Sequence, residues 1–390
     1  MNERQNRGVK QLDLLRGLAI VLMIVNHAGI SFTGAVQPPY SLLSACVFLG
    51  SFAPVIFFFT TGFGIGVSRK RVDTWGFLSV LQKAGLLIVA DQFLWWKASR
   101  PYGLDFLGFI GVSSVLITAI AMVRRPVLLS ALSIAAALLL RFGAGSWLQG
   151  RYLLTGMGAW IVGFPATADV SYPLSPWIVY PLLGFILGRQ YRAELQGFPR
   201  RMWVMQTAVA AAALGCSCVL LYRQAVFFRW GTMSFAYFVL SIAVLVVMLA
   251  SAWRAASYLP TAAKALSLRG VASLAVVPIH YVVLDIAARW VPGAFLPVVW
   301  IAIVAVVAAS ILLANAFTKI ANRLVVKPVI TAPILGGVIL VCAVAMWKLN
   351  AANSASALLS FLVGQIAVTG LLAIKNRERR TQAALTPAPS

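Results

Sequence analysis

Ionisable side chains are scarce in this sequence. Only 11% of the 390 residues are charged, nine are acidic, two are histidine and four are cysteine. With 61% apolar residues and a mean hydropathy of +0.91, such a chain cannot be arranged around a soluble core. The cysteines indicate neither a metal site nor a disulfide framework, because Cys216 and Cys218 point different ways on one predicted helix and the other two stand alone. The composition therefore excludes a soluble globular protein and indicates a polytopic membrane protein.

Apolar stretches of membrane-spanning length recur along the whole chain. A spanning helix needs about 20 predominantly apolar residues. We predict an all-α membrane protein with about twelve transmembrane helices, eleven being the alternative count. The predicted spans are residues 12–32, 42–67, 77–96, 106–123, 127–142, 172–187, 202–222, 233–253, 271–288, 295–317, 329–347 and 355–374.

The distribution of Lys and Arg predicts the orientation of these spans. Basic residues accumulate in short cytoplasmic loops, and most of the 32 in this chain fall on one side when the N-terminus is placed in the cytoplasm. Twelve spans then put both termini in the cytoplasm. We predict a cytoplasmic N-terminal segment at residues 1–11, a single transmembrane domain at 12–376 and a disordered cytoplasmic tail at 377–390.

The net charge of +23 is also a feature of nucleic-acid-binding proteins. Here the positive charges are scattered as loop anchors rather than gathered on one soluble domain. We therefore predict a lipid bilayer as partner, no nucleic acid, and the inner (cytoplasmic) membrane of a bacterium as location. The oligomeric state has no signal in the sequence.

The longest connection, residues 143–171, contains an apolar portion at 147–165. A full crossing there would reverse every later loop and put most of the following basic residues outside, against the usual charge rule. We interpret the connection as an outer loop or a re-entrant hairpin. Long ordered loops are often lids or binding loops.

Each of the two histidines ends a similar sequence motif. Leu15-Arg16-Gly17 leads to His27, and Leu268-Arg269-Gly270 leads to His280, with Arg eleven residues before His in both. On a helix, that spacing puts Arg and His on one face roughly 16 Å apart. Ionisable groups within the bilayer are costly and mark pathways or reaction centres. The alternative role for His27 is structural, a hydrogen bond to a neighbouring helix, which contributes about 1 kcal/mol. Arg16 alone would be a topology anchor. His280 follows Pro278 and is interpreted as a residue that satisfies a carbonyl freed by the proline.

One carboxylate is expected at the depth of His27. Asp91 is about as far into the third predicted helix as His27 is into the first, and both helices start on the cytoplasmic side. A carboxylate there would orient the imidazole and raise its basicity. The alternative partner for Asp91 is Lys97 or Arg100 at the outer boundary.

The sequence around these residues resembles the transmembrane acyltransferases, namely the acyltransferase type 3 proteins and the heparan-alpha-glucosaminide N-acetyltransferase-like proteins. Residues 12–19, together with Asn26-His27 further along the same predicted helix, resemble the first helix of that superfamily. Residues 52–66 resemble its second helix, which has an aromatic run and a Gly-rich end. Segments 104–111, 176–189 and 272–280 are more similar to the second branch. The resemblance extends from Leu12 to Ile286.

The resemblance implies transfer of an acyl group, usually acetyl from acetyl-CoA, to a hydroxyl or amine on the far side of the membrane. The first-helix histidine, His27, is then the expected catalytic base, and Arg16 helps to hold the donor. Asp91, expected at the same depth, is the candidate catalytic partner of His27. An acyl-CoA has a polyanionic head and a long, thin arm, which suits a cationic mouth with a base roughly 16 Å deeper. The residues expected in that mouth are Arg16, Arg69, Lys70, Arg71 and Lys83.

The acceptor is expected to be a cell-envelope glycan, a lipid or a small molecule. No metal is expected. Aromatic residues of the long outer connection could stack on a sugar or sit at the membrane interface. The residues expected to contact the acceptor are Asn26, Asp105, Trp160 and His280.

Two other functions fit the predicted topology. Twelve helices with both termini inside are also typical of secondary transporters of small solutes or envelope precursors. Two features argue against a transporter. The two halves of the chain show no convincing repeat beyond the Arg-to-His motifs, and few charged residues lie deep enough in the predicted spans to couple transport to an ion. A non-catalytic membrane scaffold would leave the shared face of Arg16 and His27 unexplained.

Overall fold

The computed structural model describes residues 3–33, 42–68, 73–95, 103–144, 157–162, 170–193, 208–209, 211–212, 233–258, 261, 271–291, 296–324 and 362–376. Within these ranges the secondary structure is helical, apart from one isolated bridge between Leu104 and Val170. Among the described residues, five helical stretches are long and apolar enough to cross a membrane: Gln11–Thr33, Leu42–Val67, Pro126–Gly143, Phe235–Ala255 and Leu296–Arg323. The all-helical membrane class is thereby confirmed.

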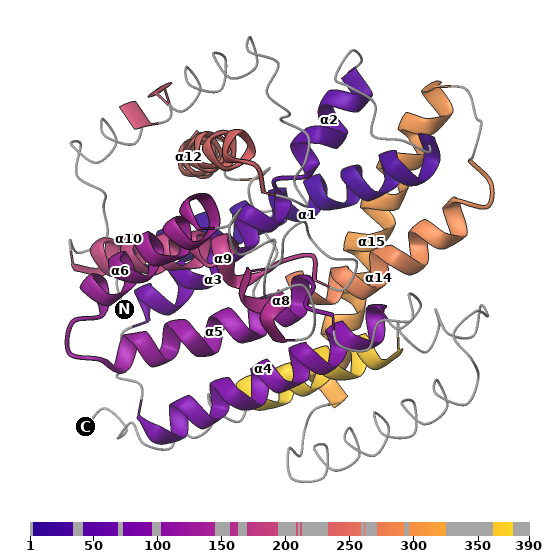
Figure 1. Cartoon of the computed structure of the whole chain (residues 1–390). Coiled ribbons are helices and arrows are strands. Elements are labelled where there is room, and N and C mark those ends of the chain that lie inside the picture. Colours follow the sequence, from indigo (N-terminus) through magenta and orange to yellow (C-terminus); the bar gives the residue numbers. More distant parts are fainter. Residues whose placement is uncertain are drawn as a thin grey trace.

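Figure 1 shows how the helices are arranged. Their bounds are α1 Glu3–Thr33, α2 Leu42–Gly50, α3 Ala53–Val67, α4 Thr74–Trp95, α5 Phe106–Met122, α6 Pro126–Leu138, η2 Leu139–Gly143, α8 Met157–Val162, α9 Leu174–Trp177, α10 Val179–Ala193, α12 Phe235–Tyr258, α14 Val271–Ala287 and α15 Leu296–Leu324. Helices α4, α5 and α14, and α6 together with η2, begin and end within three residues of a predicted span, whereas α1 begins nine residues earlier and α15 ends seven residues later than predicted. A further apolar helix covers Leu362–Asn376. The predicted spans 202–222 and 329–347 lie largely or wholly outside the described residues, as does most of the connection 143–171, in which α8 lies.

The predicted second span consists of two helices. Ser51 and Phe52 form a turn between α2 and α3, in which their N–H groups donate to the carbonyls of Phe48 and Leu49. Proline has no N–H to donate and is tolerated in the first turn of a helix, and Pro54 occupies that position in α3. The aromatic run that follows is buried from Phe57 to Phe59.

Helices α3 and α10 pack closely through glycines. A Cβ added at Gly62 would meet the backbone of Pro181, and one added at Gly184 would meet the carbonyl of Phe59. Gly66 and Gly188 are equally enclosed by the opposite helix. Small residues let helix backbones approach one another within a membrane, so these glycines bring α3 and α10 together.

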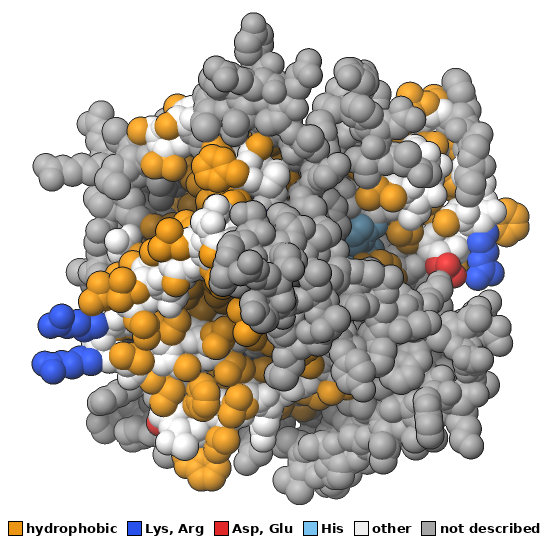
Figure 2. All heavy atoms as spheres, in the orientation of Figure 1, with side chains coloured by type: hydrophobic (Ala, Val, Ile, Leu, Met, Phe, Trp, Pro, Cys, Tyr) orange, Lys and Arg blue, Asp and Glu red, His pale blue; other side chains and the backbone are white. Residues whose placement is uncertain are grey.

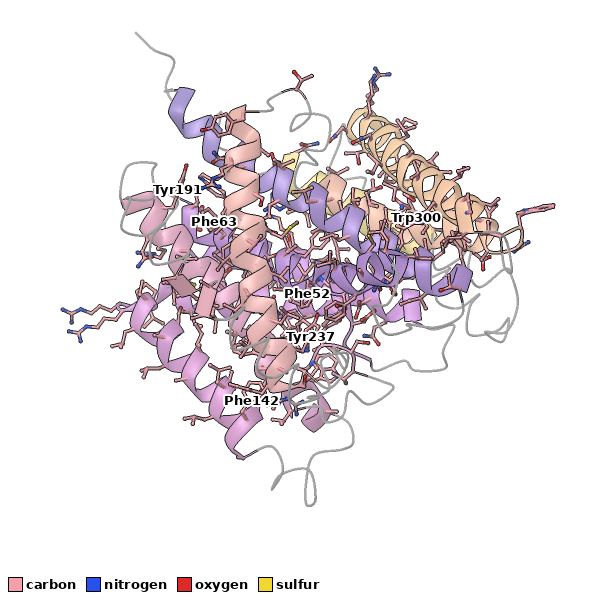
Figure 3. The ribbon with its side chains drawn as sticks, turned by 90° about the horizontal axis from the view of Figure 1, so that it is seen from above. Phe52, Phe63, Phe142, Tyr191, Tyr237 and Trp300 are labelled. Atoms are coloured by element: carbon pink, nitrogen blue, oxygen red, sulfur yellow. The ribbon has the colours of Figure 1, made fainter. Side chains whose placement is uncertain are left out.

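Helix α1 lies at the centre of the described part of the fold. It packs against α2, α3, α12, α14 and α15, and its inward face, with Leu15, Ile20 and Ile24, is fully buried. Figure 3 shows Tyr237 of α12 beside Phe52. Their rings stack with centroids 4.9 Å apart, and the Tyr237 hydroxyl donates to the Ser51 carbonyl at 2.8 Å.

The outer helices expose apolar side chains. Only 17% of the Pro126–Gly143 stretch and 22% of the Leu296–Arg323 stretch is buried by the rest of the protein. Figure 2 shows apolar side chains over much of the described surface on one face, with charged side chains near its margins. Such a surface is suited to contact with lipid tails.

Candidate active site

The two histidines meet at the contact of α1 with α14. His27 Nδ1 lies 2.9 Å from His280 Nε2, within hydrogen-bond distance. The two rings are nearly parallel, with centroids 5.1 Å apart and an interplanar angle of 21°. His27 and His280, which end the two similar sequence motifs, therefore form one pair, although 253 positions separate them.

The histidines differ in exposure. His280 is fully buried, whereas His27 is only partly buried. Tyr281 stacks on His27 with centroids 5.4 Å apart and keeps 37% of its surface exposed. Figure 2 shows histidine atoms visible from outside, next to apolar side chains. Of the pair, His27 is thus the member that keeps some exposed surface.

Both helices hold their histidine through local contacts. On α1, the Asn26 side-chain amide donates to the Val47 carbonyl at 2.7 Å and ties the helix to α2. On α14, His280 Nδ1 lies 3.1 Å from the Val276 carbonyl. Pro278 frees the carbonyl of Leu274, four residues before it. The ring of His280 therefore bonds a different carbonyl from the one the sequence predicted.

A further helix covers α14 on another side. The Gln365 amide donates to the Ala275 carbonyl at 3.3 Å, and a Cβ at Gly364 would meet the ring of Pro278. This close approach contributes to the burial of the α14 segment that carries His280.

Asp91 caps α5. Its Oδ2 accepts the N–H of Asp105 at 2.8 Å, and its Oδ1 accepts the N–H of Leu107 at 3.0 Å. The first N–H groups of a helix have no partner within the helix, and the helix dipole favours a negative charge there. The position next to His27 that was considered for Asp91 is occupied by His280, and a role of Asp91 in the chemistry stays a prediction.

Asp105 directly precedes α5 and lies near Tyr281, the tyrosine that stacks on His27. It interacts electrostatically with Tyr281 and with the buried Tyr172. The sequence interpretation missed both tyrosines. Tyr281 directly follows His280, which was a usable signal, whereas nothing local marks Tyr172.

Arg16 lies on the same helix as His27, roughly 16 Å away along its axis. Its Nη1 forms an ion pair with Asp13 at 3.1 Å, and its Nη2 donates to the Thr60 carbonyl at 3.4 Å. Gly64 of α3 lies beside the guanidinium, where an added Cβ would make an ordinary van der Waals contact with Nη2 at 3.5 Å. The side chain is 20% exposed. A guanidinium has five N–H donors, so Arg16 retains donors for an anionic ligand.

The other predicted site residues are distributed more widely. Lys83 lies half-buried on α4, which packs against α5. Trp160 of α8 is half-buried and packs against the main apolar core. The basic run Arg69, Lys70 and Arg71 lies outside the described residues. Among the described residues, no group of three or more His, Cys, Asp or Glu gathers to hold a metal ion.

One protein family matches this chain. The sequence model described as heparan-alpha-glucosaminide N-acetyltransferase, catalytic, matches residues 9–223, more than half of the chain. The matched region includes Arg16, His27, Asp91 and Asp105 and ends before α14. No curated protein and no solved structure matches.

Proposed function

Because this chain belongs to the heparan-alpha-glucosaminide N-acetyltransferase catalytic family, we propose that it moves an acetyl group from cytoplasmic acetyl-CoA to an acceptor in the cell envelope. The family and the apolar helices make it a membrane protein of the acetyltransferase type. The donor, the acceptor and the residues that act on them are the proposal. The observation that carries it is a partly exposed histidine, His27, hydrogen-bonded to a buried one.

In the proposed reaction His27 is the general base. The hydroxyl or amine of the acceptor attacks the thioester carbonyl, a C–O or C–N bond forms, and the C–S bond breaks. His27 takes the proton from the attacking atom and returns it to the departing thiolate of CoA. General-base catalysis of this kind contributes typically 10²–10⁴-fold to a rate.

Arg16 is the proposed contact for the donor. The phosphates of CoA carry several negative charges, and a guanidinium binds phosphate oxygens through parallel N–H groups. The roughly 16 Å between Arg16 and His27 along α1 suits the long pantetheine arm. Arg69, Lys70, Arg71 and Lys83 are proposed to extend the cationic mouth on the cytoplasmic side.

The acceptor is proposed to approach His27 from the side of Tyr281 and Asp105. Hydroxyl and carboxylate groups there can pair with the hydroxyls or the amine of a sugar. The family description names a glucosaminide, which makes the amine of a glucosamine unit the first acceptor to test. Asn26 and Trp160 stay predicted acceptor contacts, and a lipid or a small amine would use the same chemistry.

The proposed topology has twelve transmembrane helices with both termini in the cytoplasm of a bacterium. Arg16 then faces the cytoplasm, and His27 lies three turns deeper. In this proposed topology the donor approaches His27 from the cytoplasmic side and the acceptor from the opposite side.

The proposal is tested with purified protein in lipid and [14C]acetyl-CoA. Methyl α-glucosaminide offers an amine and methyl α-glucoside only hydroxyls, so the pair identifies the attacking atom. We expect labelled product from wild type and a loss of at least about 100-fold in His27→Ala. Ile30→Ala, nearly one turn further along α1, is the matched control and should keep full activity. Full activity in His27→Ala would remove His27 from the chemistry. Solute counterflow in proteoliposomes without acetyl-CoA would instead favour a transporter.

A further inference from the structure

The hydrogen bonds of His280 determine which of its nitrogens carries a proton. Nδ1 lies 3.1 Å from the Val276 carbonyl oxygen. A carbonyl oxygen only accepts, so Nδ1 must be the donor. A neutral imidazole carries one N–H, which leaves a lone pair on Nε2.

A second proton on His280 is disfavoured by its surroundings. The side chain is fully buried, and its neighbours on α14, Val276, Val277 and Ile279, are buried apolar residues. An unpaired charge in such a place is strongly unfavourable, because it loses its hydration without gaining a partner. The resting ring of His280 is therefore neutral, and its Nε2 accepts.

The acceptor at His280 Nε2 sets the protonation of its partner. His27 Nδ1 lies 2.9 Å from this nitrogen, and a hydrogen bond between them needs one proton. That proton belongs to His27 Nδ1, and the other nitrogen of a neutral His27, Nε2, then has a lone pair. We propose that His280 is a positioning residue that holds His27 in the tautomer whose Nε2 is the base.

The consequence for catalysis rests on the proposed function. When His27 Nε2 takes the proton of the attacking hydroxyl or amine, the ring becomes a cation. Its Nδ1–H continues to donate to His280 Nε2, which stabilises this cation and keeps the ring in place. The proton leaves from Nε2 to the CoA thiolate, so the Nδ1 proton does not move. A carboxylate has this role in the Ser-His-Asp triad, where the wrong tautomer costs about 10⁴-fold in kcat.

The tautomers can be measured without any activity. The chain contains only two histidines, so protein labelled with [15N]histidine gives two imidazole signals, and His280→Gln assigns them. Nitrogen shifts separate N–H from lone-pair nitrogens. We expect both rings neutral at pH 7.5, each protonated at Nδ1, with scalar coupling between His27 Nδ1 and His280 Nε2. A His27 protonated at Nε2 alone would overturn the inference, whether or not the protein transfers acetyl groups.

Two substitutions test the consequence for the reaction. His280→Leu fills the buried site with an apolar side chain and removes the acceptor nitrogen. The kcat should then fall by at least about 100-fold, while the KM for acetyl-CoA stays within about twofold. His280→Gln restores an acceptor oxygen near the position of Nε2 and should recover at least about tenfold of that loss. Ile279→Ala disturbs the same buried turn of α14 without touching the pair, and its kcat should stay near wild type.

The outcomes separate the two proposals. Equal kcat values for His280→Leu and wild type would overturn the positioning role even if His27→Ala is inactive. Equal losses in His280→Leu, His280→Gln and Ile279→Ala would mean that His280 only packs α14. If wild type transfers no acetyl group, the proposed function fails, and the nitrogen shifts still decide the tautomer.

Discussion

Removal of the Asp91 carboxylate should unfold the start of α5 rather than stop the chemistry. The two oxygens of Asp91 accept the N–H groups of Asp105 and Leu107 at 2.8 and 3.0 Å. The Asp91 side chain is 2% exposed, and a Cβ at Gly108 would meet its Oδ2. In Asp91→Ala, water has little access to replace the lost acceptors.

The size of the loss follows from these contacts. Leaving one buried N–H without an acceptor costs about 1–3 kcal/mol, so two would cost roughly 2–6 kcal/mol. Part of this loss is offset, because the wild-type protein also has to bury the polar carboxyl group, which is unfavourable. We expect Asp91→Ala to lower the free energy of unfolding by about 3 kcal/mol. In Asp91→Asn one amide oxygen remains as an acceptor, and the expected loss is about half as large.

The free energy of unfolding can be measured in mixed detergent and dodecyl sulfate micelles, with helicity as the signal. Asp285→Asn is the matched control. That carboxylate is 45% exposed and pairs with Arg289 at 3.2 Å on the surface of α14. Exposed pairs of this kind contribute about 1 kcal/mol or less, so this variant should unfold almost like wild type.

The activity of the folded fraction gives the refuting result. If Asp91 acts as a cap, the Asp91→Asn protein that remains folded should transfer acetyl groups at a rate within a few-fold of wild type. If Asp91→Asn is as stable as wild type but inactive, the capping argument is refuted and Asp91 belongs to the chemistry.

Two further predictions concern the donor and the helix packing. Arg16→Gln should raise the KM for acetyl-CoA more than it lowers kcat. Arg124 is an exposed basic residue between α5 and α6, so the control variant Arg124→Gln should change neither value. An unchanged KM in Arg16→Gln would remove Arg16 from the donor site. Gly184→Ala should destabilise the protein by about 1–3 kcal/mol, because its Cβ would meet the Phe59 carbonyl, while Gly85→Ala, with nothing within 4 Å of its Cβ, should cause no loss in the same unfolding measurement.

Much of the helical framework was predictable from local patterns. Apolar stretches predicted the start of α5 at Phe106 and of α14 at Val271, and both helices begin there. Proline positions also act locally, since Pro54 and Pro126 each lie in the first turn of a helix. The turn at Ser51 and Phe52 was missed, because an apolar stretch continues through it without a change in composition.

The candidate site was only partly predictable. The sequence singled out His27, Arg16 and His280 because ionisable residues are rare in apolar stretches. It paired His27 with Asp91 by depth along two helices, but depth does not say which way a side chain points. Asp91 faces the start of α5, and His280 faces His27, because of how α4 and α14 pack against their neighbours.

Hydropathy and spacing along single stretches are enough to predict that this protein is helical and membrane-embedded, and which few ionisable residues its helices carry. Which of those residues meet depends on how the helices pack. Two histidines 253 positions apart come within 2.9 Å of each other only because α1 and α14 pack side by side. The partner of a side chain thus depends on contacts between helices, which no single stretch of sequence contains.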